Sequence, residues 1–234
     1  MASDRLTTRI GGLTLPNPII RGSGEPVMTE AGIRAALAAG AGGVIARSVN
    51  ERPEAAKQLD LADYVTLDID GARSLFNRSG LTFRDTRDWF HAIAAIDRQA
   101  AKTNRFVAAG IVFAGADGAV AIACMARDAG LRVFELNVGA PHASEASPGA
   151  ITQETDPARM ALAGASAVEV MSIVMHEGFG ALTRLIVELD AFLTVRDPRF
   201  NDLIGLTADR LASYGAQTPH PDRWRDFVPP ETLE

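Results

Sequence analysis

The 234-residue sequence predicts an α/β fold in which short parallel strands alternate with amphipathic helices. Short apolar runs recur along the chain, and most are followed by a longer segment with apolar residues at helical spacing. Two of these runs end abruptly in polar residues, as Val-Ile-Ala-Arg-Ser at 44–48 and Phe-Glu-Leu-Asn at 134–137. In a barrel of parallel strands, functional side chains lie where strands end and loops begin. We therefore expect a functional site at these strand ends.

The N-terminal part of the chain predicts a hairpin, a first strand and a capped helix. Residues 6–15 form two alternating runs around a Gly-Gly pair, a pattern that is typical of a β-hairpin. The first parallel strand is expected to begin near Asn17 and to end at residues 21–24. Thr29 is expected to cap a helix that ends before Gly40, because its hydroxyl can accept a hydrogen bond from a free backbone N–H.

The same alternation continues through the rest of the chain. Residues 50–84 are expected to be mostly polar loop with a short strand at 64–69, and 158–165 to be the end of a helix. The proline-rich tail at 215–234 is expected to be irregular. The other predicted elements are strands at 43–48, 106–112, 132–138 and 167–172, and helices at 86–103, 116–129 and 180–193.

These elements amount to about five barrel-type strands, whereas a complete (β/α)₈ barrel has eight strands and typically about 250 residues. Between 138 and 167 the sequence contains no strand–helix–strand pattern. We therefore predict one domain over 1–234, a TIM-type barrel with an N-terminal β-hairpin that is incomplete as given, with a gap near 156–158. Either an internal deletion or a stretch missing from this sequence explains the gap.

Composition is that of an ordinary globular protein, 47% hydrophobic and 22% charged. The net charge of −6 and the scattered basic residues argue against a nucleic-acid or anionic-membrane partner. Cys124 is the one cysteine, so no intrachain disulfide forms and no cysteine-based metal site is predicted; we expect it on a buried helix face. No apolar run reaches about 18 residues and no signal peptide is evident, so we expect a soluble cytoplasmic protein.

Several short motifs occur in a fixed order: Asn17-Pro18, the turn at 22–24, the strand at 44–48, residues 77–81, the strand at 134–137 and residues 177–180. In this order they resemble the dihydroorotate dehydrogenase family, FMN-dependent oxidoreductases with a TIM-barrel fold. Residues 6–145 are similar to the N-terminal half of that family, and 158–210 to its last quarter. The family's fifth, sixth and seventh strands have no counterpart.

The resemblance implies an FMN site at the strand ends. Gly22 and Ser23 match the family's turn beside the flavin. Arg47 stands where the family has a lysine that contacts both flavin and substrate, and Ser48 follows it. Arginine can supply the charge, although its planar fork is not equivalent to an ammonium group. Asn137 matches the asparagine that bridges flavin and substrate.

The same resemblance implies a substrate site and a phosphate site. Asn77 matches the asparagine that holds the substrate's carboxylate or imide, and His142 matches a polar substrate contact. Ala140 replaces the family's Cys or Ser base, and a methyl group cannot remove a proton. His142 titrates near neutral pH and is the alternative base. The family's phosphate-binding Gly-Thr appears as Met171-Ser172, where the amide and hydroxyl of Ser172 can still bind a phosphate.

Three functions remain open from the sequence. The first is an FMN-dependent oxidoreductase that exchanges a hydride with a small carbonyl- or carboxylate-bearing substrate, and the resemblance implies a homodimer. The second, favoured by Ala140 and Met171, is a catalytically inactive barrel that acts as a binding or structural subunit. The third is a phosphate-binding barrel enzyme without flavin, since a fold does not fix a function. Structural roles also exist for single residues, such as an ion pair for Arg47 or a turn for Asn77.

Overall fold

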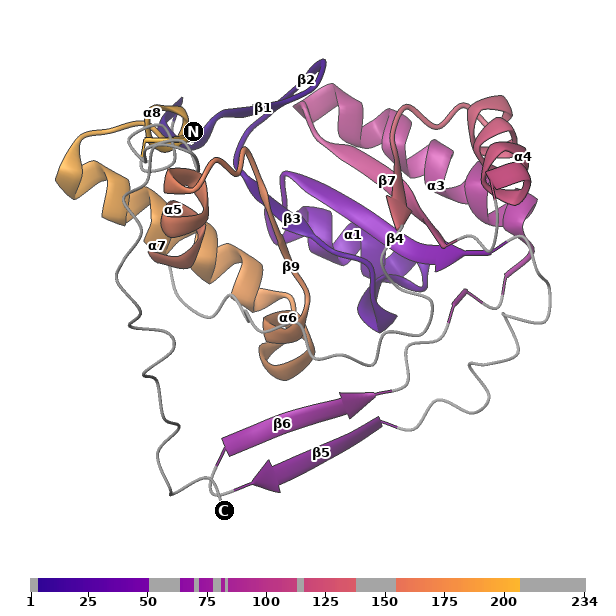
Figure 1. The fold of residues 1–234 in the computed structure, drawn as a ribbon, viewed down its shortest axis with the longest axis horizontal. Helices are drawn as coiled ribbons and strands as arrows, with labels where there is room; N and C mark the ends of the chain where they lie inside the picture. The colour runs from indigo at the N-terminus through magenta and orange to yellow at the C-terminus, as the bar shows by residue number, and fades with distance from the viewer. Residues whose placement is uncertain are drawn as a thin grey trace, which may run out of the picture.

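The computed structural model describes residues 4–50, 64–69, 72–77, 81–82, 84–112, 116–137 and 155–206. Within these residues, five parallel strands form one sheet in the order β8-β7-β4-β3-β9, and two antiparallel pairs form separate sheets. Figure 1 shows the parallel sheet curled like half of a barrel, with helices around it and the pair of β5 (Tyr64–Ile69) and β6 (Ala72–Asn77) apart from it. The predicted α/β class is therefore confirmed, and the described strands form an open half-barrel.

The strand order explains this shape. The first parallel strand, β3, pairs with β4 on one side and with β9, the last strand, on the other. In a complete barrel the first and last strands are neighbours in the same way. The parallel strands are β3 (Ile19–Arg21), β4 (Gly43–Val49), β7 (Phe106–Val112), β8 (Phe134–Asn137) and β9 (Val168–Val170).

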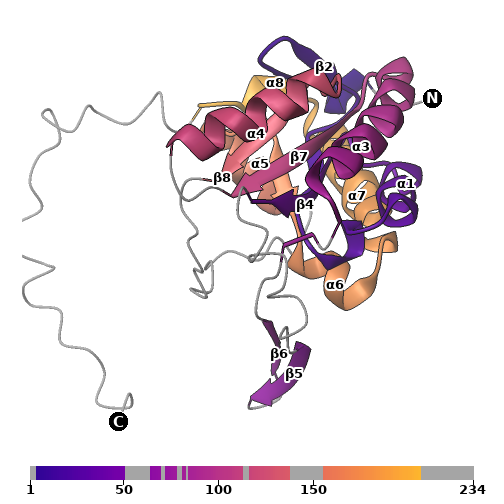
Figure 2. The ribbon, with the colours of Figure 1, turned by 90° about the vertical axis from the view of Figure 1, so that its right-hand side faces the viewer.

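Two of the helices begin where a side chain satisfies free backbone N–H groups. Thr29 accepts a hydrogen bond from the N–H of Gly32 at 3.2 Å and caps α1, and the carboxylate of Asp85 accepts two backbone hydrogen bonds and caps α3. Figure 2 shows α1, α3 and α4 on one side of the molecule. The helices are α1 (Glu30–Ala38), α3 (Thr86–Ala100), α4 (Ala116–Asp128), α5 (Thr155–Leu162), α6 (Ser172–Glu177), α7 (Gly180–Arg196) and α8 (Phe200–Leu203), and the 3₁₀ turns are η1 (Asp4–Leu6), η2 (Glu25–Val27) and η4 (Ala101–Thr103).

Two apolar clusters hold the sheet. The larger joins the helices to the outward side chains of the strands, such as Ile19 and Val44. The smaller includes Ile20, Ile45 and Phe106 on the opposite face, where the hairpin of β1 (Thr8–Ile10) and β2 (Leu13–Leu15) packs against it. Because Phe106 is the first residue of its strand, the hairpin covers the amino ends of the strands. The hairpin does not cover the carboxyl ends of the strands, where a functional site can therefore lie.

A buried carboxylate fixes the approach to β7 and β8. Asp97 on α3 is fully buried and accepts a hydrogen bond from the N–H of Val107 at 2.8 Å. The same carboxylate accepts hydrogen bonds from Nε and Nη2 of Arg132 at 2.7 and 2.8 Å. One side chain therefore joins α3, the start of β7 and the segment that leads into β8.

Most predicted elements are confirmed, among them the strand at 106–112 and the N-terminal hairpin. The loop prediction was wrong for β6 (Ala72–Asn77), which pairs antiparallel with β5 (Tyr64–Ile69). Asp70-Gly71 lies between them in the sequence, and Asp-Gly is a strong hairpin signal that the loop prediction overlooked. The strand predicted at 167–172 is also too long, since β9 ends at Val170 and α6 begins at Ser172.

Three smaller expectations have different outcomes. Cys124 lies on α4 as predicted, but it is only partly buried. In the part of the chain that the structure describes, no helix combines the length and the apolar character of a membrane span. The tail at 215–234 lies outside the described residues.

Candidate functional site

Four of the predicted site residues meet at the carboxyl ends of β3 and β4. Gly22 and Ser23 directly follow β3, and Arg47 and Ser48 lie near the end of β4. The hydroxyl oxygens of Ser23 and Ser48 are 3.1 Å apart, within hydrogen-bonding distance. The N–H of Gly22 donates to the carbonyl of Val170 at 3.1 Å, which ties this turn to the end of β9. The predicted cluster therefore joins three neighbouring strand ends.

Arg47 forms a buried ion pair. Its Nη2 lies 2.9 Å from Oε1 of Glu25 on η2, and its side chain is only 6% exposed. Its backbone carbonyl accepts a hydrogen bond from the indole N–H of Trp89 at 3.1 Å, which fixes this part of β4 against α3. The structural role that the sequence left open for Arg47, an ion pair, is thus present.

Arg21, the last residue of β3, was missed by the sequence prediction. Its side chain is fully buried, and its Nη1 donates to the carbonyls of Gly22 and Val170. Among the described residues, Nε and Nη2 have no hydrogen-bond partner. Burial lowers the pKa of Arg21 to about 10, against the opposing effect of the Glu25 carboxylate. A charged residue directly after two isoleucines was the available signal.

Two glycines permit close approach at the site. A Cβ on Gly110 of β7 would lie 2.5 Å from Oγ of Ser48, so Ser48 can lie over β7 only because this residue is glycine. A Cβ on Gly24 would lie 2.9 Å from Nη2 of Arg21 and 3.3 Å from the sulfur of Met171. The backbone at Gly24 thus lies directly against the buried guanidinium.

Two carboxyl groups interact across the sheet. Glu135 lies on β8 and Glu169 on β9, the first and last strands in the sheet order. Burial raises the pKa of Glu169 to about 7, and the charge of Glu135 and a hydrogen bond to it act in the same direction, while Arg21 opposes them. Glu169 is exposed as a whole residue, but its Oε2 lies 3.0 Å from where a Cβ on Gly22 would be, so its carboxyl end is crowded.

For three of the remaining predicted site residues, the structure gives the position in the fold. Asn137 is the last residue of β8, where its backbone lies opposite Val112, so its position at a strand end is confirmed. Ser172 is exposed and begins α6. Asn77 ends β6, in a two-stranded sheet of its own. His142 and Ala140 lie outside the described residues, so their predicted roles are not tested.

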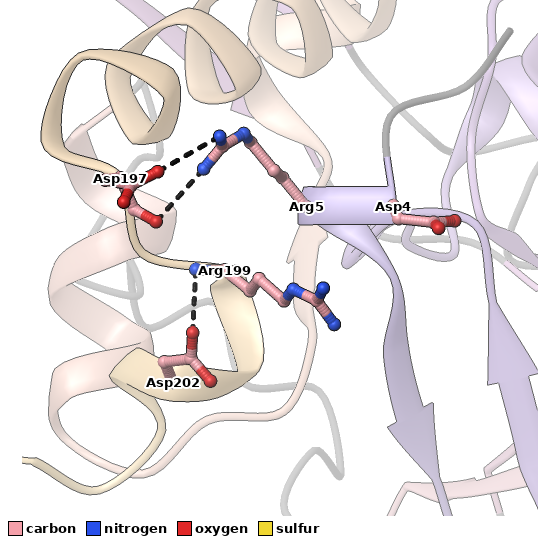
Figure 3. Close-up of a pocket in the computed structure, with 5 residues that line it drawn as sticks. All are labelled: Asp4, Arg5, Asp197, Arg199 and Asp202. Carbon is pink, nitrogen blue, oxygen red and sulfur yellow. Dashed lines mark hydrogen bonds and ion pairs between the residues drawn. The ribbon is translucent and has the colours of Figure 1, made fainter.

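A polar cleft of about 480 Å³ lies elsewhere, at the C-terminal end of α7 (Figure 3). Arg5 donates to the backbone carbonyl of Asp197 at 3.0 Å and to its carboxylate at 3.2 Å. The backbone N–H of Arg199 donates to the carboxylate of Asp202 at 2.9 Å. Arg5 thus fixes the N-terminal turn against the end of α7, and Asp202 caps α8, so we assign the cleft a structural role. Among the described residues, no group of three metal-ligating side chains occurs.

Comparison with known proteins finds no family model and no curated protein that matches the chain. The chemistry that the described residues offer lies at the carboxyl ends of β3, β4 and β9. The geometry there consists of two hydroxyls in contact, two buried guanidiniums and a carboxyl group with a raised pKa.

Proposed function

We propose that this chain binds FMN at the carboxyl ends of β3 and β4 and acts as a flavin-dependent oxidoreductase on a small carbonyl- or carboxylate-bearing substrate. The proposal follows the resemblance to the dihydroorotate dehydrogenase family. One observation carries it: the hydroxyls of Ser23 and Ser48, 25 positions apart in the sequence, lie 3.1 Å apart beside the buried Arg47. These are residues that the resemblance assigns to the flavin.

The residues present fit such a cofactor. A flavin site needs hydrogen-bonding groups at the edge of the ring, a positive charge near its N1–C2=O edge and small residues close to the ring. Ser23 and Ser48 can donate or accept hydrogen bonds, and Arg47 would supply the charge. Gly22 and Gly110 would supply the small residues. FMN, when bound, supplies the capacity to accept or donate a hydride.

Proton transfer needs a group that changes charge near neutral pH. Ala140 cannot serve, and His142 remains the base that the sequence predicts. Glu169 adds a second group, because its pKa is raised to about 7 and its carboxyl end lies beside Gly22. A carboxyl group in this state can hold a proton at the strand ends and release it at neutral pH.

Flavin binding to the purified chain tests the proposal directly. FMN is titrated into the protein, and binding is followed by the quenching of flavin fluorescence. Ser48→Ala should weaken binding by roughly 2- to 10-fold, as expected for the loss of one hydrogen bond. Thr194→Ala removes a hydroxyl at an exposed position of α7 and is the matched control, with no expected effect. Absence of binding by the wild-type chain would reject the function, and normal binding by Ser48→Ala would reject the site.

A second candidate is the non-catalytic binding subunit. Ala140 favours it, as do Phe134 and Leu136 of β8, which are 38% and 48% exposed in the described part of the chain. Large apolar side chains on an outer strand suit contact with another protein. This candidate predicts a chain that associates but binds no flavin. Sedimentation combined with the flavin titration separates the two candidates.

A further inference from the structure

The buried guanidinium of Arg21 has one edge without a partner. Nη1 donates to the two carbonyls of Gly22 and Val170, whereas Nε and Nη2 have no hydrogen-bond partner among the described residues. Nε and Nη2 together form the side of the guanidinium fork that binds carboxylates and phosphates through two parallel hydrogen bonds. The unsatisfied atoms of Arg21 are thus the pair that an oxyanion would use.

The charges around Arg21 also favour an anion. The groups that act on it electrostatically are Glu25, Arg47 and Glu169. The carboxylate of Glu25 is already 2.9 Å from Nη2 of Arg47. Glu169 is only partly ionised at neutral pH, because its pKa is about 7. Two guanidiniums therefore face less than two full negative charges, and both are buried.

A flexible, partly exposed side chain, Met171, lies close to Arg21. A Cβ placed on Gly24 would lie 3.3 Å from the sulfur and Cγ of Met171. The same Cβ would lie 2.9 Å from Nη2 of Arg21. Met171 is 45% exposed and follows β9. A methionine side chain is unbranched and flexible, so it can change rotamer at low cost. Such a movement would open the guanidinium toward the strand ends, where Ser172 is exposed.

We propose that Arg21 binds the phosphate monoester of FMN through Nε and Nη2, with Met171 as a movable cover. This inference rests on the proposed function, because it assigns the phosphate end of the same cofactor. A complete parallel barrel commonly binds phosphate after its seventh and eighth strands. In this chain, the phosphate would instead be bound by Arg21, which lies at the end of β3 beside the last strand, β9.

The test compares FMN with riboflavin, which lacks the phosphate, on wild-type protein and on Arg21→Met and Arg21→Lys. Arg21→Met should weaken FMN binding by roughly 10- to 100-fold, the range for a charged hydrogen-bonded contact. Riboflavin binding should be unchanged, and Arg21→Lys should fall between the wild type and Arg21→Met. Arg105→Met is the matched control, because that partly buried arginine also donates to a backbone carbonyl but precedes β7 at the opposite end of the sheet.

Folding is checked by the unfolding temperature of each variant without ligand. Arg21→Met should change this temperature by only a few degrees, because it loses the hydrogen bonds from Nη1 but also removes a buried charge with two unsatisfied donors. Equal weakening of FMN and riboflavin by Arg21→Met, or no weakening of FMN, would overturn the inference. Met171→Ala should speed FMN association with little change in affinity. A loss of affinity as large as that of Arg21→Met would show that Met171 is not a cover.

Inorganic phosphate separates the failure of this inference from that of the proposed function. If the wild-type chain binds neither FMN nor riboflavin, the proposed function fails while the anion site is still testable. Stabilisation of the wild type by phosphate that is lost in Arg21→Met would support the anion site. Equal stabilisation of both proteins by phosphate, or none of either, would overturn it.

Discussion

Replacing Glu25 by glutamine should destabilise the protein strongly. The Glu25 side chain is 15% exposed and lies 2.9 Å from the almost fully buried Arg47, with Arg21 also within its field. The substitution keeps the shape of the side chain but removes the negative charge that acts on both buried guanidiniums. Breaking a buried pair by removing one partner costs about 3–5 kcal/mol. Because Glu25 keeps some exposure, we expect the free energy of unfolding to fall by about 3 kcal/mol, the lower end of this range.

For a chain of this size, each kcal/mol shifts the unfolding temperature by about 2–4 °C, so Glu25→Gln should lower it by about 6–12 °C. Urea denaturation followed by circular dichroism gives the free energy directly. Glu30→Gln is the matched control: its ion pair with Arg84 spans 3.4 Å at an exposed site and should contribute less than about 1 kcal/mol. A loss below 0.5 kcal/mol for Glu25→Gln, roughly that of an ordinary surface substitution, would refute the reasoning.

Three further predictions concern stability and pH. Asp97→Ala should cost about 3–5 kcal/mol by leaving Arg132 and a buried backbone N–H without their acceptor, and an unchanged urea midpoint would contradict this. The folded protein binds the Glu169 proton more tightly than the unfolded chain, so its stability should fall as the pH rises from 4.5 to about 7. Glu169→Gln should remove this dependence of stability on pH and raise the free energy of unfolding at pH 8 by about 1 kcal/mol or less, because solvent screens the group. An unchanged dependence on pH would contradict the raised pKa. Gly110→Ala should force Ser48 aside and weaken FMN binding at least as much as Ser48→Ala, while binding equal to wild type would exclude this close approach.

The elements that the sequence predicts well are those whose signal is local. The strand at 106–112 is a continuous apolar run, and α3 follows an aspartate that caps it, so both can be found without knowing their neighbours. Residues 72–77 are different, because they form a strand only by pairing with β5. Its sequence has Arg73 and Ser74 side by side and shows no regular alternation, so it is recognisable as a strand only together with β5 and the Asp-Gly pair between them.

In the candidate site, too, several residues can be identified from the sequence, whereas their long-range contacts cannot. The resemblance identifies Ser23 and Ser48, and the structure brings their hydroxyls together. The burial of Arg21 could not be predicted, since it depends on β9, which is 149 positions away. The contact between Glu135 and Glu169 likewise arises from the curl of the sheet, which brings strands from its two ends close to each other.

The pairing of β3 with β9 has a consequence for synthesis on the ribosome. One edge of β3 can pair with β4 once about 50 residues have emerged, but its other edge must wait for Val168. At about 5–20 residues per second, the roughly 120 residues in between take about 6–24 seconds. During that interval an apolar strand edge is open to other nascent chains, which is a known route to aggregation. Arg21 gains the carbonyl of Val170 only when β9 docks, so the proposed anion site can be complete only after this part of the chain has been made.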